Sequence, residues 1–228
     1  MRYIEKMRPP DSFKDAVKNI LSIEDWSEFK NPEKSDTAMY MLEKEQKYLC
    51  VYCERRINDF PKNCHFEHLK PRSIDKMHNT FDYSNLTLSC NSGTNEKLEG
   101  DTTYESITCG HKKREFFNEG KFLSPVELKN ISDYFVFDFI DGSIESSEKK
   151  VESATYMIDL LNLNDAGLKI ARRNALKNLR KYIQRNYKTN HERKNALIKI
   201  LDATNKKQLV PYYTFLCYSF KDVLKQSE

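Results

Sequence analysis

Apolar residues recur at helical spacing near both ends of the chain, whereas its middle contains shorter alternating runs. At the N-terminal end, a helix is expected from Asp11, directly after a pair of prolines. A second helix is expected to start at Ser35 or Asp36 and to run into Cys50. The pattern therefore predicts a helical buttress, residues 1–46, in front of the middle of the chain.

The C-terminal region, residues 148–228, is predicted to be helical. One helix is expected to end near Asn162, and a longer one spans about 165–187. The longer helix has an apolar stripe with a period of about 3.6 residues. The stripe consists of Leu168, Ala171, Ala175, Leu176, Leu179 and Ile183. Two more helices are expected at 191–203 and 211–225.

Short strands are predicted in the middle region, residues 47–147. Residues 65–68 alternate in polarity like a strand, which Pro71 ends, and residues 85–88 are typical of a second strand. A helix is expected to begin near residues 93–95. The predicted order is therefore strand, loop, strand and helix.

Two further elements are predicted in the same region. A short helix is expected from residue 112, and residues 135–146 have the pattern of a β-hairpin. Asp141-Gly142 lies between its two β-prone runs, which is a strong hairpin signal. The chain is therefore expected to have an α+β fold, with helical regions on both sides of the part that contains the strands.

The composition is that of a soluble protein with enough apolar residues for a core. Of the 228 residues, 39% are hydrophobic and 32% are charged, and the net charge is +4. This mild positive charge is only a weak indication of a polyanionic partner. The pattern contains no signal peptide or membrane span, so a cytoplasmic location without membrane contact is expected. In the cytoplasm, the six cysteines are expected to stay reduced and to favour metal binding over disulfides.

Four of the six cysteines have the spacing of ligands to one metal ion. Cys50 and Cys53 are separated by two residues, so both thiolates can reach the same ion from a tight turn. Cys90 follows the second predicted strand, and Cys109 comes later in the chain. Four sulfur ligands are typical of structural Zn²⁺. His111 is an alternative to Cys109 as the fourth ligand, and the other two cysteines have no partner at zinc spacing.

An acid and two histidines lie between these cysteines. In a strand, His65 and Glu67 lie on the same face, and His68 follows them. Metal-dependent hydrolysis of nucleic acid requires a base to activate water and hard oxygen ligands for an ion such as Mg²⁺. Histidine suits the base because its pKa lies near neutrality, and glutamate and amide oxygens suit the ion. These residue types therefore favour a nuclease site.

Glu67-His68, Asn85-Leu86, Cys90 and Asn95-Glu-Lys97 together resemble the sequence pattern of the HNH nuclease family, whose fold is a ββα-metal core. The resemblance implies that His68 is the general base and that Glu67 is a ligand of a catalytic Mg²⁺ or Mn²⁺ ion. It also implies that Asn85 braces the loop between the two strands.

The resemblance leaves the last ligand of the catalytic ion open. The family's usual spacing falls on Thr94, but Gly93 replaces a family cysteine, which frees the local register. Asn95 is therefore preferred, with Asn91 as the alternative. His65 is expected to be a further ligand or to support one.

A closer resemblance is to PtuB, a group of HNH nucleases from Septu and retron-associated anti-phage systems. It rests on the motifs Cys-x-Tyr-Cys-Glu, His-x-Glu-His-x-x-Pro, Asn-Leu-x-x-Ser-Cys-Asn and Cys-Gly-His-Lys-Lys. The resemblance implies a PtuA-like ATPase partner of the ABC/SMC type. The aromatic residues of the C-terminal helices, among them Tyr182 and Tyr212, are then expected to form its docking surface. Phe215 and Phe220 suit the core better.

Basic residues are expected to hold the nucleic acid. Those close to the proposed site in the sequence are Lys70, Arg72, Lys97, Lys112 and Lys113. The many Lys and Arg residues of the 165–187 helix suit nucleic-acid binding and a solvated or partner-contacting face equally well. The expected function is metal-dependent endonuclease activity in anti-phage defence, with DNA as the preferred substrate and RNA such as tRNA as an alternative that the sequence leaves open. The alternative is a zinc ribbon that binds nucleic acid without cleaving it, or that acts as an adaptor.

Overall fold

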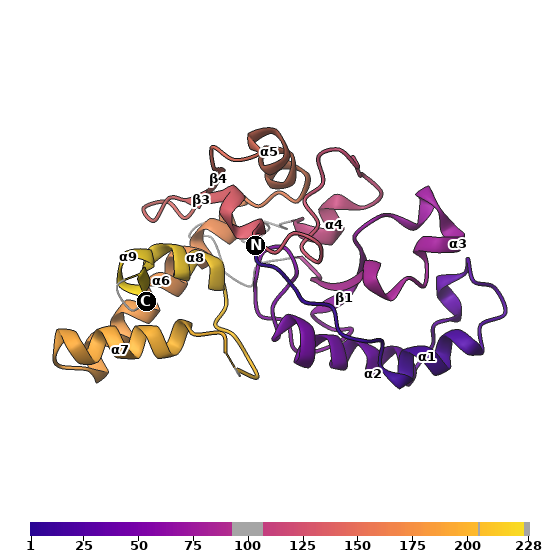
Figure 1. Cartoon of the computed structure of the whole chain (residues 1–228), viewed down its shortest axis with the longest axis horizontal. Helices are drawn as coiled ribbons and strands as arrows, with labels where there is room; N and C mark the ends of the chain where they lie inside the picture. Colours follow the sequence, from indigo (N-terminus) through magenta and orange to yellow (C-terminus); the bar gives the residue numbers. More distant parts are fainter. Residues whose placement is uncertain (93–106, 205, 226–228) are drawn as a thin grey trace, which may run out of the picture.

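The computed structural model describes residues 1–92, 107–204 and 206–225, and mixes helices with two small sheets (Figure 1). This agrees with the predicted α+β class. Its α-helices and strands are α1 (Asp11–Lys18), α2 (Glu33–Tyr40), β1 (Cys64–His68), α3 (Lys76–Asn79), β2 (Leu86–Cys90), α4 (Cys109–Lys113), β3 (Phe135–Phe137), β4 (Ile144–Ser146), α5 (Val151–Leu160), α6 (Ala166–Asn186), α7 (Asn190–Leu201), α8 (Tyr213–Ser219) and α9 (Lys221–Lys225). A π-helical segment, η2 (Met41–Gln46), continues α2, and 3-10 helices are η1 (Trp26–Glu28), η3 (Arg72–Ile74), η4 (Tyr83–Asn85) and η5 (Ile131–Tyr134).

Some of the predicted features lie outside the described residues. These are the helix expected near 93–95 and the residues Thr94, Asn95 and Lys97. The proposed roles of these residues therefore stay predictions.

The N-terminal part is helical, as predicted, but its second helix begins earlier than expected. α2 starts at Glu33, so Ser35 and Asp36 lie inside the helix rather than at its start. The physical reason is the proline directly before it, whose fixed φ suits the start of a helix. Phe13 of α1 has its ring centroid 5.1 Å from that of Tyr83, which joins this part to the middle region.

Both predicted strands of the middle region are present and pair with each other. β1 and β2 are antiparallel, with Cys64 opposite Cys90 and Glu67 opposite Thr87. Every residue of β2 is buried, and α4 packs against this strand. The short helix expected to start at residue 112 is wrong, because Arg114 leaves helical geometry with φ 50° and ψ −125°; α4 begins at Cys109 and already ends at Lys113.

The predicted hairpin is formed by β3 and β4, with Val136 opposite Glu145. Gly142 in its turn has a φ of +80°, which residues with a side chain rarely adopt. A Cβ atom at this position would overlap the backbone carbonyl of Lys169 in α6. The turn therefore packs directly against α6.

The C-terminal region consists of helices, as predicted. α6 closely matches the helix expected over 165–187, and the Asp165 side chain accepts hydrogen bonds from the first backbone N–H groups of α6. The single helix expected over 211–225 is wrong, because Phe220 leaves helical geometry with φ −117° and ψ 19° and separates α8 from α9. In the part of the chain that the structure describes, no helix is long and apolar enough to cross a membrane.

One hydrophobic core joins the N-terminal helices, the strands and the C-terminal helices. Tyr212 and Phe215 are buried in this core, so Tyr212 is not available for docking and Phe215 is a core residue, as expected. Glu54, directly after the Cys50–Cys53 turn, accepts hydrogen bonds from the backbone N–H and hydroxyl of Thr214 at 2.6 and 2.5 Å. The beginning of α8 therefore helps to support the cysteine turn.

Candidate active site and cysteine cluster

The four predicted zinc ligands lie together in the structure. The Sγ atoms of Cys50, Cys53, Cys90 and Cys109 are within 4.8 Å of one another, and all four residues are buried. Cys53 Sγ and Cys90 Sγ are 3.8 Å apart, which matches the edge of a tetrahedron with metal–sulfur bonds of ~2.3 Å. Cys109 completes this cluster, whereas His111 is not part of it. Four buried thiols are the donor set that suits a structural Zn²⁺ ion.

Three separate segments bring the cysteines together. Cys50 and Cys53 lie in a tight turn that an isolated β-bridge closes. Cys90 ends β2, and its backbone N–H donates to Cys50 Sγ at 3.3 Å. Cys109 starts α4, and its backbone N–H donates to the carbonyl oxygen of Leu161 at 2.9 Å. An ion bound here would therefore join the turn, the sheet and the helix.

Glu67 is buried, and one of its two carboxylate oxygens has both a hydrogen-bond donor and a cation as partners. Its Oε1 accepts a hydrogen bond from the Tyr52 hydroxyl at 2.8 Å and lies 3.0 Å from Lys113 Nζ. Its Oε2 lies 3.8 Å from His65 Nε2, which is longer than a hydrogen bond. Burial raises the pKa of Glu67, but His65 and Lys113 outweigh burial, so this pKa lies below its usual value. Glu67 is therefore ionised at neutral pH, and its Oε2 is the oxygen nearer to His65.

Lys113 is not placed to hold nucleic acid, and this prediction is corrected. The residue is only 1% exposed, and its Nζ pairs with Glu67 and donates to the carbonyl oxygen of His68 at 2.9 Å. Its charge therefore compensates a buried carboxylate inside the protein. Lys112, its neighbour in α4, is exposed and stays a candidate for contact with nucleic acid.

His65, Asn91 and His111 form a polar group beside Glu67. His65 Nδ1 and Asn91 Oδ1 are 2.9 Å apart, and the His65 and His111 rings are stacked with centroids 4.4 Å apart. Burial lowers the pKa of His65, but Glu67 and Asn91 more than compensate, so the pKa is raised. Burial and the charge of His65 lower the pKa of His111. His65 and Asn91 were predicted from the sequence to belong to the site, whereas His111 was considered only as an alternative zinc ligand.

Gly110 lets the α4 backbone approach this group closely. A Cβ atom at Gly110 would overlap Glu67 Oε2 and would lie 2.8 Å from His65 Nε2. The backbone N–H of Gly110 also donates to Ser89 Oγ at 3.0 Å, which fixes α4 on β2. A residue with a side chain at this position would therefore displace the Glu67 carboxylate or the His65 ring.

His68 lies in different surroundings from Glu67, because neighbouring residues of a strand point to opposite faces. Its Nε2 lies 3.0 Å from the carbonyl oxygen of Thr80, and its ring packs edge-on to Trp26 with centroids 4.7 Å apart. A carbonyl oxygen only accepts, so we assign the proton to Nε2 and leave Nδ1 as the basic atom. Burial lowers the pKa of His68 to about 4, so the ring is neutral at pH 7.

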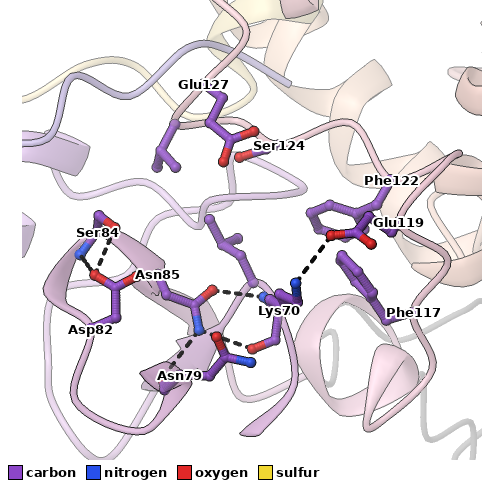
Figure 2. Close-up of a pocket in the computed structure, with 12 residues that line it drawn as sticks. Lys70, Asn79, Asp82, Ser84, Asn85, Phe117, Glu119, Phe122, Ser124 and Glu127 are labelled. Atoms are coloured by element: carbon purple, nitrogen blue, oxygen red, sulfur yellow. Dashed lines mark hydrogen bonds and ion pairs between the residues drawn. The ribbon is translucent and has the colours of Figure 1, made fainter. Parts of the chain in front are cut away.

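Asn85 braces the loop between the two strands, as predicted. Its Oδ1 accepts from the Lys70 backbone N–H at 2.7 Å, and its Nδ2 donates to the carbonyl oxygens of Lys70 and Asn79 at 2.9 and 3.3 Å. Figure 2 shows these contacts at the edge of a cavity of about 220 Å³, where Lys70 Nζ also pairs with Glu119 at 3.1 Å. Lys70 and Arg72 are partly exposed, so both stay candidates for contact with nucleic acid.

Comparisons with known proteins identify relatives of one kind. No protein-family model matches the chain. The chain is 26% identical over 180 residues to the Escherichia coli protein "Retron Ec83 putative HNH endonuclease", covering 66% of this chain and 70% of that protein. It is 29% identical over 156 residues to the Vibrio cholerae serotype O1 biovar El Tor protein "Retron Vc95 putative HNH endonuclease", covering 66% and 69%. These similarities support a nuclease of the HNH family.

Proposed function

We propose that the chain is a metal-dependent HNH endonuclease that hydrolyses phosphodiester bonds in nucleic acid, with DNA as the preferred substrate. The proposal rests on the arrangement of three elements. β1 and β2 pair, and Asn85 braces the loop between them. α4 packs on β2, which places Gly110 against Glu67. We interpret β1, β2 and α4 as the ββα-metal core. The names of the two relatives support the same family.

The cysteine cluster is proposed to bind a structural Zn²⁺ ion. Its four sulfur donors suit this metal, and its members come from the cysteine turn, β2 and α4. Since these segments also carry the residues around Glu67, the bound ion would hold the site in place.

A catalytic Mg²⁺ or Mn²⁺ ion is proposed to bind beside Glu67. Glu67 Oε2 is a hard oxygen donor, and His65 Nε2 lies close enough to share an ion with it. Asn91 would orient His65 through its hydrogen bond, and Asn95 remains a proposed further ligand outside the described residues. When bound, such an ion neutralises negative charge on the scissile phosphate and on the leaving oxygen.

His68 is proposed to be the general base. It is neutral at pH 7, and the hydrogen bond from Nε2 to Thr80 fixes the ring and leaves Nδ1 to accept the proton of the attacking water. Trp26, which the sequence did not single out, packs against the ring and limits its rotation. The oxygen of the water then attacks phosphorus, the bond to the leaving oxygen breaks, and the leaving oxygen takes up a proton from solvent.

The cellular context is proposed from the retron names of the relatives and from the PtuB-like motifs. In this proposal, the chain acts in the cytoplasm in an anti-phage complex with a PtuA-like ATPase of the ABC/SMC type. RNA such as tRNA is the alternative substrate, because attack by water requires no 2′-OH. A non-catalytic zinc-ribbon protein is the other alternative.

The test is cleavage of supercoiled plasmid and of labelled total RNA by the purified chain, with and without added Mg²⁺. We expect Mg²⁺-dependent nicking of plasmid that His68→Ala lowers by about 100-fold or more. His78→Ala is the matched control, because His78 is 76% exposed and pairs only with nearby Asp75 among the described residues. Zinc content and the melting temperature are measured for both variants, so that loss of activity is not loss of folding.

Each outcome decides between the alternatives. If the chain cleaves RNA but not plasmid, the substrate is RNA and not DNA. If His68→Ala cleaves within threefold of the parent chain, the base is another residue. A folded, zinc-loaded chain that binds nucleic acid and cleaves none would support the zinc-ribbon alternative.

A further inference from the structure

Positive charge is concentrated in two consecutive helices, α6 and α7. Residues 166–201 contain eleven Lys and Arg residues and one Glu, a net charge of +10, whereas the whole chain carries only +4. The remaining residues therefore have a net charge of −6. A polyanion is attracted to a positive surface, and these two helices supply the largest excess of positive charge in the chain.

One face of α6 presents a row of exposed cations. We call Arg173, Lys177, Lys181 and Arg185 the basic face of α6; they are spaced at i, i+4, i+8 and i+12 and are all exposed. Four-residue spacing places them along one side of the helix over ~18 Å. Within the described ranges, none of the four forms an ion pair with an acidic side chain, although like charges at this spacing repel. Repulsion without compensation is the arrangement expected of a surface that binds an external anion.

The basic face is held rigidly on the body of the protein. Arg172, the neighbour of its first residue, is buried and donates to the carbonyl oxygens of Gly142 and Leu163 at 2.9 and 2.8 Å. Lys169 Nζ pairs with Asp141 Oδ2 at 2.6 Å, so the hairpin turn fixes the first turns of α6. These two cations are therefore structural and are not part of the basic face.

α7 lies away from β1, which carries the proposed catalytic residues, whereas the first turns of α6 lie near the cysteine turn, where Arg172 and Cys53 line one small cavity. In Figure 1, α7 lies at one end of the longest axis of the molecule, and α1 and α3 lie at the other, with β1 on their side. Tyr182 is 50% exposed, beside Lys181 in the chain, and its ring centroid is 6.4 Å from that of Tyr187. An exposed aromatic ring next to cations suits stacking on an unpaired base.

We propose that the basic face of α6 binds the sugar–phosphate backbone of the nucleic-acid substrate at a distance from the cleavage site. The inference rests on the proposed nuclease function and adds the surface by which the substrate is captured. Contacts of Lys and Arg with phosphates carry no sequence information, so this surface supplies affinity and leaves the choice of the cleaved bond to the region around His68. Substrates long enough to reach both regions should therefore be bound and cleaved better than short ones.

The test measures binding without cleavage, in the full chain with His68→Ala. Fluorescence anisotropy gives the dissociation constant for a labelled duplex and a labelled single strand at several salt concentrations. The test variant is Arg173→Gln with Lys177→Gln and Lys181→Gln. The matched control, Lys30→Gln with Lys129→Gln and Lys207→Gln, removes the same charge from exposed lysines elsewhere.

We expect the test variant to bind at least tenfold more weakly at 100 mM salt, and the control to change by less than about threefold. The salt dependence should fall as well: three lost phosphate contacts lower the slope of log K against log salt by about 2 to 3. The Tyr182→Ala variant should weaken binding of the single strand more than binding of the duplex.

Two outcomes would overturn the inference. One is a test variant that binds like the control with an unchanged salt slope. The other is a test variant that binds nucleic acid normally but no longer co-purifies with an ATPase, which would make the basic face a protein-docking surface. A chain that shows the expected salt slopes but never cleaves would refute the nuclease proposal alone, so the two failures are distinguishable.

Discussion

Gly110→Ala is the sharpest perturbation of the candidate site, because it adds one methyl group at the contact between α4 and Glu67. The added Cβ would overlap Glu67 Oε2 and lie 2.8 Å from His65 Nε2, where ordinary contacts begin at 3.4 Å. The Glu67 carboxylate cannot move freely, since Tyr52 and Lys113 hold its other oxygen. The His65 ring must therefore shift by at least ~0.6 Å, and the carboxylate must rotate or α4 must move away from β2.

Activity and stability should respond differently to this change. Overpacking costs about 1–3 kcal/mol, but alanine is favoured over glycine in a helix by about 1 kcal/mol. The net loss of about 0–2 kcal/mol lowers the melting temperature by at most about 8 °C for a chain of this size. A displacement approaching 1 Å of a metal ligand lowers a rate by about 100-fold. Cleavage should therefore fall far more than folding does.

The assay is plasmid nicking at matched zinc content, together with thermal melting. Gly120→Ala is the control, because among the described residues a Cβ atom there would meet only Asn118 Oδ1 within 4 Å, at an ordinary contact distance of 3.5 Å. We expect the control to cleave like the parent chain. A Gly110→Ala protein with a cleavage rate within threefold of the parent would show that Glu67 and His65 are not held where the chemistry needs them.

Three other substitutions test separate contacts. Cys53→Ser should lower the bound zinc well below one ion per chain, whereas Cys64→Ser should leave it unchanged, as metal analysis of the purified proteins would show. Asn85→Ala leaves two Lys70 backbone groups and the carbonyl oxygen of Asn79 without their hydrogen-bond partner. The melting temperature should therefore fall by about 5–10 °C. An unchanged melting temperature would mean that the loop does not depend on this brace. Lys113→Met leaves a buried carboxylate without its cation and should destabilise the fold by about 3–5 kcal/mol in denaturant unfolding, and a loss below 1 kcal/mol would contradict the buried pair.

The strands and the cysteine cluster were predictable because their signals are local. Alternation over 65–68 and the Cys50–Cys53 spacing depend on a few neighbouring residues, and both occur in the structure as expected. The brace at Asn85 was predictable from the resemblance to a family.

The helix predicted near 93–95 lies outside the described residues and stays a prediction, and the sequence did not indicate that α4 would pack on the strands. In the described part of the chain, α4, which begins at Cys109, packs against β2, and so does the π-helical segment η2. The contact between α4 and Glu67 could not be predicted from the sequence, because it depends on the three-dimensional path that brings residue 109 back to the sheet. Lys113 was misassigned for a related reason: in a run of basic residues, only the fold determines which one is buried.

The cysteine cluster and the polar group around Glu67 are joined through neighbouring residues of the same segments. Tyr52 lies inside the Cys50–Cys53 turn and donates to Glu67, Asn91 follows directly after Cys90, and His111 lies two residues after Cys109. Each segment that supplies a thiol therefore also supplies a contact to the candidate site. Loss of the structural ion should displace these contacts at once, whereas the wider hydrophobic core, which extends to α8, can outlast it. On titration with a chelator, nicking measured with Mg²⁺ restored should therefore fall in proportion to bound zinc, before the far-ultraviolet helical signal changes. Activity that persists after the zinc is gone would separate the two sites.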